Sequence, residues 1–361
     1  MKTWHNFVLF VTLVLLGLTM GCTGDDFGAT PDLSTDLAAD MDTHTLTDSG
    51  IVDGEDPPVE MQTPDASPDL PTSGSIAFES YRNDGRPEIY LMDVDGTDIK
   101  RLTTKGGRTP RFSPDGRWIA YQLPSDNSTR LIRPDGSGDK HLHGGVPWFW
   151  HYDGSGLVVQ DNWDFFTVNP EDGTATLFFR RSDFPKLENK ILQPGGITAD
   201  GRYLVAASDR YRDGFTGDNG SFKASFAAIL LDMQDKTKLY FFGNGCAPRS
   251  APGGDWVYHV RGDGDTNPDI YHMNVNDIAT RSSYEPIIDL ADADWGHTYF
   301  PKISNDNQWL VYGASTGCHD QSSCDYEIFI HRLSAPKNQR KRLTFDPAND
   351  RSPSLFVGDL P

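Results

Sequence analysis

A repeated phrase runs through most of the chain and constrains its fold more than any other feature. Each copy has a turn with Gly or Asp, followed by an apolar strand that ends in an aromatic or small residue, as in 112–121 (FSPDGRWIAY). Fixed-period self-similarity indicates a repeat architecture. The apolar strands begin 38 to 53 residues apart, at Ile76, Ile119, Leu157, Leu204, Val257 and Leu310.

A second phrase follows each copy of the first. It has a polar loop, a strand such as 88–93 (EIYLMD) or 327–331 (EIFIH), a turn, and a short fourth strand that is clearest at 101–103 and 342–344 (both RLT). Four short strands per unit, with turn residues between them, are typical of a propeller blade. We therefore predict an all-β fold, a six-bladed β-propeller of four-stranded antiparallel blades over 74–361.

The two ends of this region complement each other. The first unit lacks its leading strand, and the chain ends in an unmatched strand at 352–357. We expect that C-terminal strand to complete the N-terminal blade, which leaves the ring without an open edge. The expected blades are 75–103 with 352–357, 109–142, 147–179, 193–242, 247–290 and 299–344.

These phrases resemble the PD40-type (WD40-like) repeats of TolB-like six-bladed propellers. The resemblance rests on 76–96 (IAFESYRNDGRPEIYLMDVDG), 113–121 (SPDGRWIAY) and the RLT triplets, and it covers almost all of 74–361. It implies the fold and no particular activity. In TolB an N-terminal α/β domain precedes the propeller, whereas an acidic segment takes that place here.

The N-terminus has the pattern of a secretory signal over 1–21. One Lys precedes an uncharged apolar run at 7–18, which is shorter than the ~20 residues that span a bilayer. Gly21 and Cys22 resemble the end of a bacterial lipobox, although Thr19 stands where that motif usually has Leu. We predict a lipid anchor on Cys22 in the periplasm, outer membrane or cell surface; the alternative is cleavage to a free secreted chain.

Much of the net charge of −20 belongs to the segment that follows Cys22. Residues 23–73 carry 13 acidic side chains and no Lys or Arg. A segment this polar cannot bury enough apolar surface to offset the entropy of ordering. We therefore predict that 22–73 is a disordered linker. Without a basic stripe, the chain is not expected to bind nucleic acid.

The loops that enter each inner strand are expected to carry the binding site, because loops on a rigid scaffold commonly carry function. Trp148, Trp295, His297 and Arg351 are expected near the channel mouth on that face. We predict a non-enzymatic, monomeric binding or scaffold module, whose partner is an envelope protein, a peptide segment or a polysaccharide. For each Trp the competing interpretation is packing between blades.

An enzyme is the alternative. Some propellers of similar repeat type are uronate lyases with a His-bound metal. Under this alternative hypothesis, the chain is a carbohydrate-active enzyme in which His297 acts at the channel mouth. The other strand histidines are not expected to converge with it into the three ligands that a catalytic metal needs. Residues 313–317 match G-x-S-x-G but lack the strand-turn-helix context of a nucleophile elbow, so we interpret the match as chance.

Two further features concern metal and redox chemistry. Asp263, Asp265, Asn267 and Asp269 offer alternating oxygens for a structural Ca²⁺, although the loop departs from the EF-hand pattern. No other cofactor is expected. Cys318 and Cys324 flank one loop and are predicted to form a disulfide in an oxidising compartment; a pairing of Cys246 with either remains open.

Overall fold

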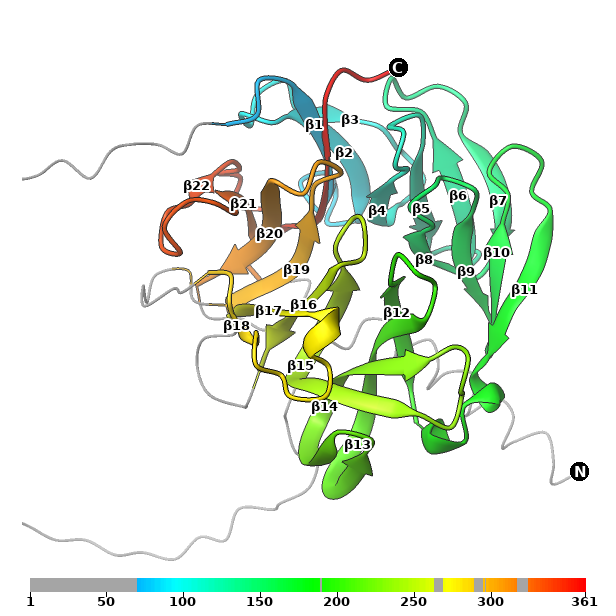
Figure 1. Cartoon of the computed structure of the whole chain (residues 1–361). Coiled ribbons are helices and arrows are strands. Elements are labelled where there is room, and N and C mark those ends of the chain that lie inside the picture. Colours follow the sequence, from blue (N-terminus) through cyan, green and yellow to red (C-terminus); the bar gives the residue numbers. More distant parts are fainter. Residues whose placement is uncertain (1–69, 189, 263–268, 289–294, 296, 317–323) are drawn as a thin grey trace, which may run out of the picture. The chain divides into compact units, whose positions relative to one another are not determined.

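The protein is described by a computed structural model that covers residues 70–188, 190–262, 269–288, 295, 297–316 and 324–361. Within these residues, antiparallel β-sheets follow one another around a ring (Figure 1). The predicted all-β propeller of antiparallel sheets is confirmed. The expected signal segment, Cys22 and almost all of the acidic linker lie outside the described residues.

Four sheets are separate four-stranded blades. The first contains β23 (Asp350–Val357), β1 (Gly74–Ser80), β2 (Glu88–Asp93) and β3 (Lys100–Arg101). The second contains β4 (Arg108–Phe112), β5 (Ile119–Leu123), β6 (Ser128–Ile132) and β7 (Lys140–Gly144). The third contains β8 (Val146–Trp150), β9 (Leu157–Asp161), β10 (Asp164–Val168) and β11 (Ala175–Arg180). The fourth contains β19 (His297–Ile303), β20 (Trp309–Ser315), β21 (Glu327–Arg332) and β22 (Lys341–Arg342).

The region expected to form the two blades 193–242 and 247–290 is one seven-stranded sheet. Its strands are β12 (Leu192–Ile197), β13 (Tyr203–Gly217), β14 (Gly220–Asp232), β15 (Leu239–Ser250), β16 (Trp256–Arg261), β17 (Ile270–Asn274) and β18 (Glu285–Pro286). The first half of β15 pairs with β14, and its second half pairs with β16. The strand therefore continues where we expected a break between two blades.

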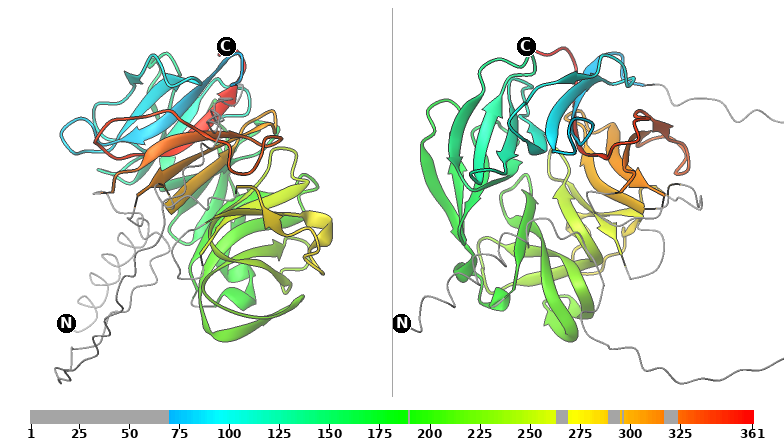
Figure 2. Two further views of the ribbon diagram at one scale, coloured as in Figure 1. Left: turned by 90° about the vertical axis from the view of Figure 1, so that its left-hand side faces the viewer. Right: turned by 180° about the vertical axis from the view of Figure 1, so that it is seen from behind.

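The C-terminal strand β23 pairs antiparallel with β1, as expected. Leu355 lies opposite Ile76, and Ser354 lies opposite Ala77. In Figure 1 this strand is drawn in red beside the blue β1, although the two are far apart in the sequence. The right-hand view in Figure 2 shows the ring from behind, again with β23 in red beside the blue β1.

The recurring S/T-x-D turn has a structural cause. Ser113 Oγ donates to Asp115 Oδ1 (2.6 Å), and Ser113 Oγ itself accepts the backbone N–H of Trp118 (3.0 Å). Thr198 and Ser304 make the same pair of contacts in their own copies. Each side chain thus pins the turn between the first and second strand of its sheet, which explains why this phrase recurs.

The RLT triplet is structural as well. Arg101 Nη2 lies 2.7 Å from Glu88 Oε1, and Thr103 Oγ1 accepts the backbone N–H of Ile89 (2.9 Å). Glu327, Arg342 and Thr344 repeat these contacts at 2.7 and 2.9 Å. The repeated residues therefore fasten a fourth strand that is only two residues long.

Residues 209–223 form a hairpin between β13 and β14. Strands β13 and β14 continue past the sheet and meet at a turn after Gly217. Aromatic rings hold the hairpin down: Phe222 stacks on Phe241 at 4.2 Å, and Tyr211 lies 5.0 Å from Phe222. These rings belong to a core cluster that also contains Phe179. Aromatic packing thus stabilises the extension of these two strands beyond the sheet.

Short 3₁₀ helices connect some strands: η1 (Arg181–Asp183), η2 (Pro185–Leu187) and η3 (Val275–Asp277). In the part of the chain that the structure describes, none of the helices has the length and apolarity needed to cross a membrane.

Candidate functional site

A cavity of about 380 Å³ lies among the innermost strands of the sheets. Its walls come from β4, β8, β12, β15, β19 and β23, which neighbour one another through direct contacts. Trp150 Nε1 donates to the carbonyl of Arg111 (3.1 Å), and the backbone N–H of Phe112 donates to Ser354 Oγ (3.0 Å). The cavity is thus the centre of the ring, and it reaches the turns that follow these strands.

One register position recurs on every inner strand and lines this cavity. On each strand it is the residue before the one that pairs with Ile119, Leu157, Leu204, Val257, Leu310 or Ile76 of the second strand. Equivalent positions on radially arranged strands face the same axis, so their side chains converge. The residues are Arg111, Phe149, Gly196, Arg249, Lys302 and Ser354.

Three of these positions are basic, and they lie on one arc. Following the ring from β15 through β19 and β23 to β4 gives Arg249, Lys302, Ser354 and Arg111. None of the described residues that line the cavity is acidic. We call Arg111, Arg249 and Lys302 the cationic arc.

The opposite arc of the cavity wall has aromatic residues and glycines in place of charged side chains. Phe149 and Trp150 come from β8, while β12 contributes Gly195 and Gly196, which have no side chains. A Cβ on Gly195 would lie 1.6 Å from the carbonyl oxygen of Pro248, so glycine is required where β12 meets β15. The cavity therefore has a charged side and an aromatic side.

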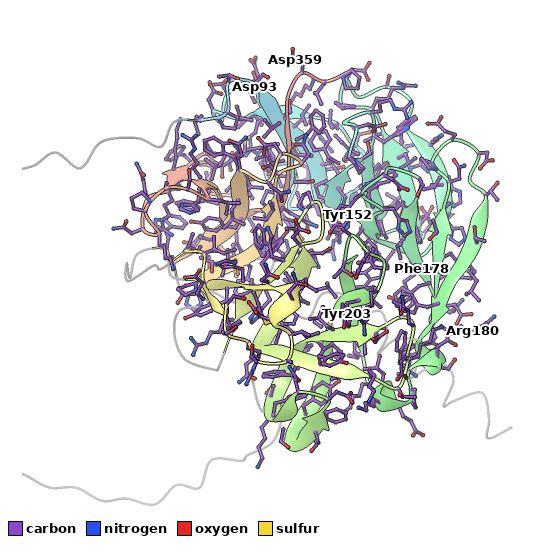
Figure 3. All side chains as sticks on the ribbon, viewed as in Figure 1. Asp93, Tyr152, Phe178, Arg180, Tyr203 and Asp359 are labelled. Carbon is purple, nitrogen blue, oxygen red and sulfur yellow. The ribbon has the colours of Figure 1, made fainter. Side chains whose placement is uncertain are left out.

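Two tyrosines complete the polar contacts of the wall. Tyr258 OH accepts the backbone N–H of Ile303 (3.1 Å), and Tyr152 OH donates to Ser250 Oγ. Figure 3 labels Tyr152 on the inner side of the ring, with Asp93 at its outer edge. Burial raises the pKa of Tyr258 to about 12 and also raises the pKa of Tyr152, so both phenols stay neutral near pH 7.

The cationic arc is electrostatically strained. Burial, and then the like charge of Arg249, lowers the pKa of Arg111 well below its usual value. Burial, followed by the charges of Arg111 and Arg249, does the same to the pKa of Lys302. Burial also lowers the pKa of Arg249. These groups repel one another across a space without a described carboxylate.

The four residues predicted to form a binding site do not line this cavity. Trp148 is buried in β8 and donates from Nε1 to Gln160 Oε1 (3.0 Å). Arg351 is buried in β23, where its guanidinium is paired with Glu79 (3.1 Å). Both side chains thus make internal contacts, as the packing interpretation expected for Trp148.

Trp295 and His297 lie at the start of the sheet formed by β19–β22. Trp295 packs on Phe329 at 5.6 Å, and the Arg342 guanidinium lies 4.3 Å above its ring. Arg342 also lies 4.6 Å from the ring of Phe345, which is 70% exposed. His297 opposes Ser315 across β19 and β20. Sequence reasoning missed Arg342 and Phe345, which extend Trp295 into an exposed surface.

The remaining predicted sites are only partly described. Asp263, Asp265, Asn267, Gly317 and Cys318 lie outside the described residues, whereas Asp269 is described and half-buried. The described residues contain no group of three or more His, Cys, Asp or Glu side chains placed to hold a metal. Cys246 and Cys324 are disulfide-bonded and belong to one buried cluster. The Ca²⁺ site stays a prediction.

Sequence reasoning also missed the cationic arc, although a signal existed. Arg111 and Lys302 each stand two residues before the Ser that opens a turn phrase, and Arg249 stands two residues before Ala251 at the same place. The clearest copy of the repeat, 112–121, begins one residue after Arg111, so the recurring basic residues lie just outside the repeated segment.

Comparisons with known proteins agree with the observed fold. No family model matches the chain. A stretch of 49 residues is 49% identical to the Tol-Pal system protein TolB of Geobacter sulfurreducens, which is 13% of this chain and 11% of that protein. The chain therefore matches only about a tenth of the length of this curated relative.

Solved structures agree on the fold. TolB from Acinetobacter baumannii is similar with a TM-score of 0.54 and 14% identity, over 78% of this chain and 66% of that one. A TolB-type structure from Agrobacterium tumefaciens gives a TM-score of 0.52 and 15% identity, over 79% and 92%. At such identities the likeness shows a TolB-like propeller fold alone.

Proposed function

We propose that this chain is a non-enzymatic binding or scaffold module of the bacterial cell envelope. The observation that carries the proposal is the coincidence of a TolB-like fold with a stretch 49% identical to a Tol-Pal system protein. Loops on a rigid ring suit partner recognition. We propose an envelope protein as the partner, and the Pal protein is the first to test because the relative's name includes it.

Export and anchoring belong to the same proposal. The signal-like residues 1–21 and the lipobox-like Gly21 and Cys22 support a lipid anchor. The disulfide bonds of Cys246 and Cys324 suit an oxidising compartment. Radiolabelled palmitate should enter the wild-type chain and not the Cys22→Ser variant; absence of label from the wild type would refute the anchor.

We also infer that the seven-stranded sheet is two blades joined along β15, which gives six blades closed by β23. Gly245 supports this, because a Cβ there would lie 2.0 Å from the Val260 carbonyl oxygen. Gly145, between β7 and β8, is required for the same reason, because a Cβ there would lie 1.9 Å from the Gln160 carbonyl oxygen. A hydrophobic cluster with Phe242 and Met273 also lies between the two halves.

The partner surface we propose consists of Trp295, Arg342 and Phe345. The Arg342 guanidinium lies close to both rings, and Phe345 is among the most exposed large apolar side chains described. Aromatic and Arg side chains supply much of the binding energy in protein interfaces. A solvent-exposed Phe held beside a cation therefore suits an amphipathic protein segment.

Calorimetry with the mature chain and the Pal protein of the same bacterium tests this function. We expect binding that Phe345→Ser weakens at least tenfold, whereas Leu177→Ser leaves it unchanged. Leu177 is a matched control because it is an exposed apolar residue (41%) on β11. Absence of binding by the wild type, or equal effects of the two variants, would refute the proposed partner or the proposed surface, respectively.

A further inference from the structure

We propose that the central cavity is a binding site for an organic carboxylate. The cationic arc (Arg111, Arg249 and Lys302) holds the carboxylate, and the aromatic side formed by Phe149 and Trp150 receives an apolar part of the ligand. This inference concerns a second site and does not depend on the proposed partner surface.

The geometry brings the three cations to one level of the ring. Arg111 lies opposite Ala120, Arg249 opposite Tyr258, and Lys302 opposite Val311, which is the same register position on three inner strands. Side chains at this position line the same cavity. Basic groups on separate strands therefore surround one point, as a site for an anion requires.

Among the described residues, no carboxylate pairs with the cationic arc. The buried Arg351, in comparison, lies 3.1 Å from Glu79. By contrast, Arg111 donates from Nε to the Pro147 carbonyl (3.2 Å), and Arg249 donates from Nη1 to the Pro248 carbonyl (2.9 Å). Neither contact neutralises a charge.

The arc also has an unused hydrogen-bond donor. The Nε of Arg249 is buried without a hydrogen-bond partner among the described residues. Arg111 is only 7% exposed, so water compensates little of its charge. Burying a charge costs free energy unless a counter-charge is supplied. An anion in the cavity supplies this counter-charge. The anion also opposes the burial and the positive charges that lower the pKa of Lys302.

The size and the lining of the cavity define the ligand class. Small-molecule sites are commonly ~300–1,000 Å³, mostly apolar, with a few convergent polar groups, and this cavity of about 380 Å³ fits the lower end. Guanidinium groups match the two oxygens of a carboxylate. The carboxylate can belong to a small free acid or to the C-terminus of a protein chain, since both present the same group.

Titration calorimetry of the mature full-length chain tests the site with defined probes. The probes are 3-phenylpropionate, its uncharged amide, and an acetylated tripeptide ending in Phe with a free or an amidated C-terminus. We expect an acid to bind at least tenfold more tightly than its matching amide. Binding should weaken as NaCl rises, because salt screens the charges.

Variants locate the binding. Lys302→Met keeps the length of the side chain and removes its charge, so we expect at least a tenfold loss of affinity, and likewise for Arg249→Gln. Arg117→Gln is the charge-matched control, because Arg117 is exposed (55%) and does not line the cavity. Lys302→Arg keeps the charge and should therefore retain the binding that Lys302→Met loses. Thermal melting of each variant shows whether it is folded.

The outcomes separate the sources of the carboxylate. Binding of the free acid without the peptide supports a small-molecule ligand, and binding of the free-terminus peptide supports a protein C-terminus. The proposal is overturned when no acid binds at millimolar concentration, when amides bind as well as acids, or when folded Lys302→Met and Arg249→Gln variants bind like the wild type.

Discussion

Arg351 in the last strand lies against Glu79 in the first, with Nη2 3.1 Å from Oε1. Both side chains are almost fully buried, at 9% and 1% exposed. The guanidinium also lies 5.3 Å from the ring of Tyr81 and 5.7 Å from the ring of Phe300. The pair therefore fastens the two ends of the propeller chain to each other.

Loss of this pair should destabilise the fold. Arg351→Ala leaves Glu79 as a buried charge without its partner, which typically costs about 3–5 kcal/mol. Urea unfolding should show a fall in the free energy of unfolding of this size. Arg117→Ala removes an exposed arginine whose ion pair contributes little. Equal effects of both changes would contradict a structural role for Arg351.

The two threonines of the RLT triplets should contribute equally. Thr103→Val and Thr344→Val each leave a buried backbone N–H, of Ile89 or Ile328, without its acceptor. An unsatisfied buried donor costs about 1–3 kcal/mol, so thermal melting should show a similar decrease in Tm for both variants. A decrease in only one of them would show that the two repeats are not energetically equivalent.

The sequence predicts the sheets better than the connections between them. Turn phrases such as Ser113–Trp118 and triplets such as Arg101–Thr103 recur because their hydrogen bonds are local. The continuous β15 could not be predicted, because Gly243 and Gly245 usually indicate a break between strands. Here Gly245 fits against the Val260 carbonyl, a contact that exists only after the sheets have packed.

The candidate site was harder to predict for the same reason. Whether a basic residue on an inner strand faces the channel depends on the pleat, and a register shift between Arg108 and Arg111 changes it. Arg351 shows the opposite error: its place near the expected mouth suggested a free cation, whereas its partner Glu79 is 272 residues away. Distant pairing of this kind has no signal in a single sequence.

Stability should fall as the pH rises through the range 5–7 because of Glu327. Burial raises the pKa of Glu327 to about 7, and the charge of Asp350 adds to the shift. Between an unfolded pKa of about 4.3 and this value, the folded protein keeps a proton that the unfolded chain has lost. Rising pH therefore favours unfolding, by an amount on the order of 1–3 kcal/mol.

Glu327→Gln removes this titration and should flatten the dependence. Buried His259, with a pKa lowered by burial to about 3, acts in the other direction, since only the unfolded chain takes up its proton below pH 6.5. The measure is therefore the difference in the free energy of unfolding between wild type and variant at pH 5 and pH 7.5. A constant difference would show that Glu327 has an ordinary pKa.

A disulfide between Cys246 and Cys324 should hold β15 to the segment before β21. Both cysteines are disulfide-bonded and lie in the same buried cluster. Peptide mapping without reductant should recover a fragment that joins them, and Cys318→Ser should preserve it. Cys246→Ser should lower the free energy of unfolding by about 2–5 kcal/mol, the usual loss for a native disulfide. A fragment joining Cys318 to Cys324 would instead support the pairing expected from their spacing, because that bond closes a short loop and leaves Cys246 as a thiol.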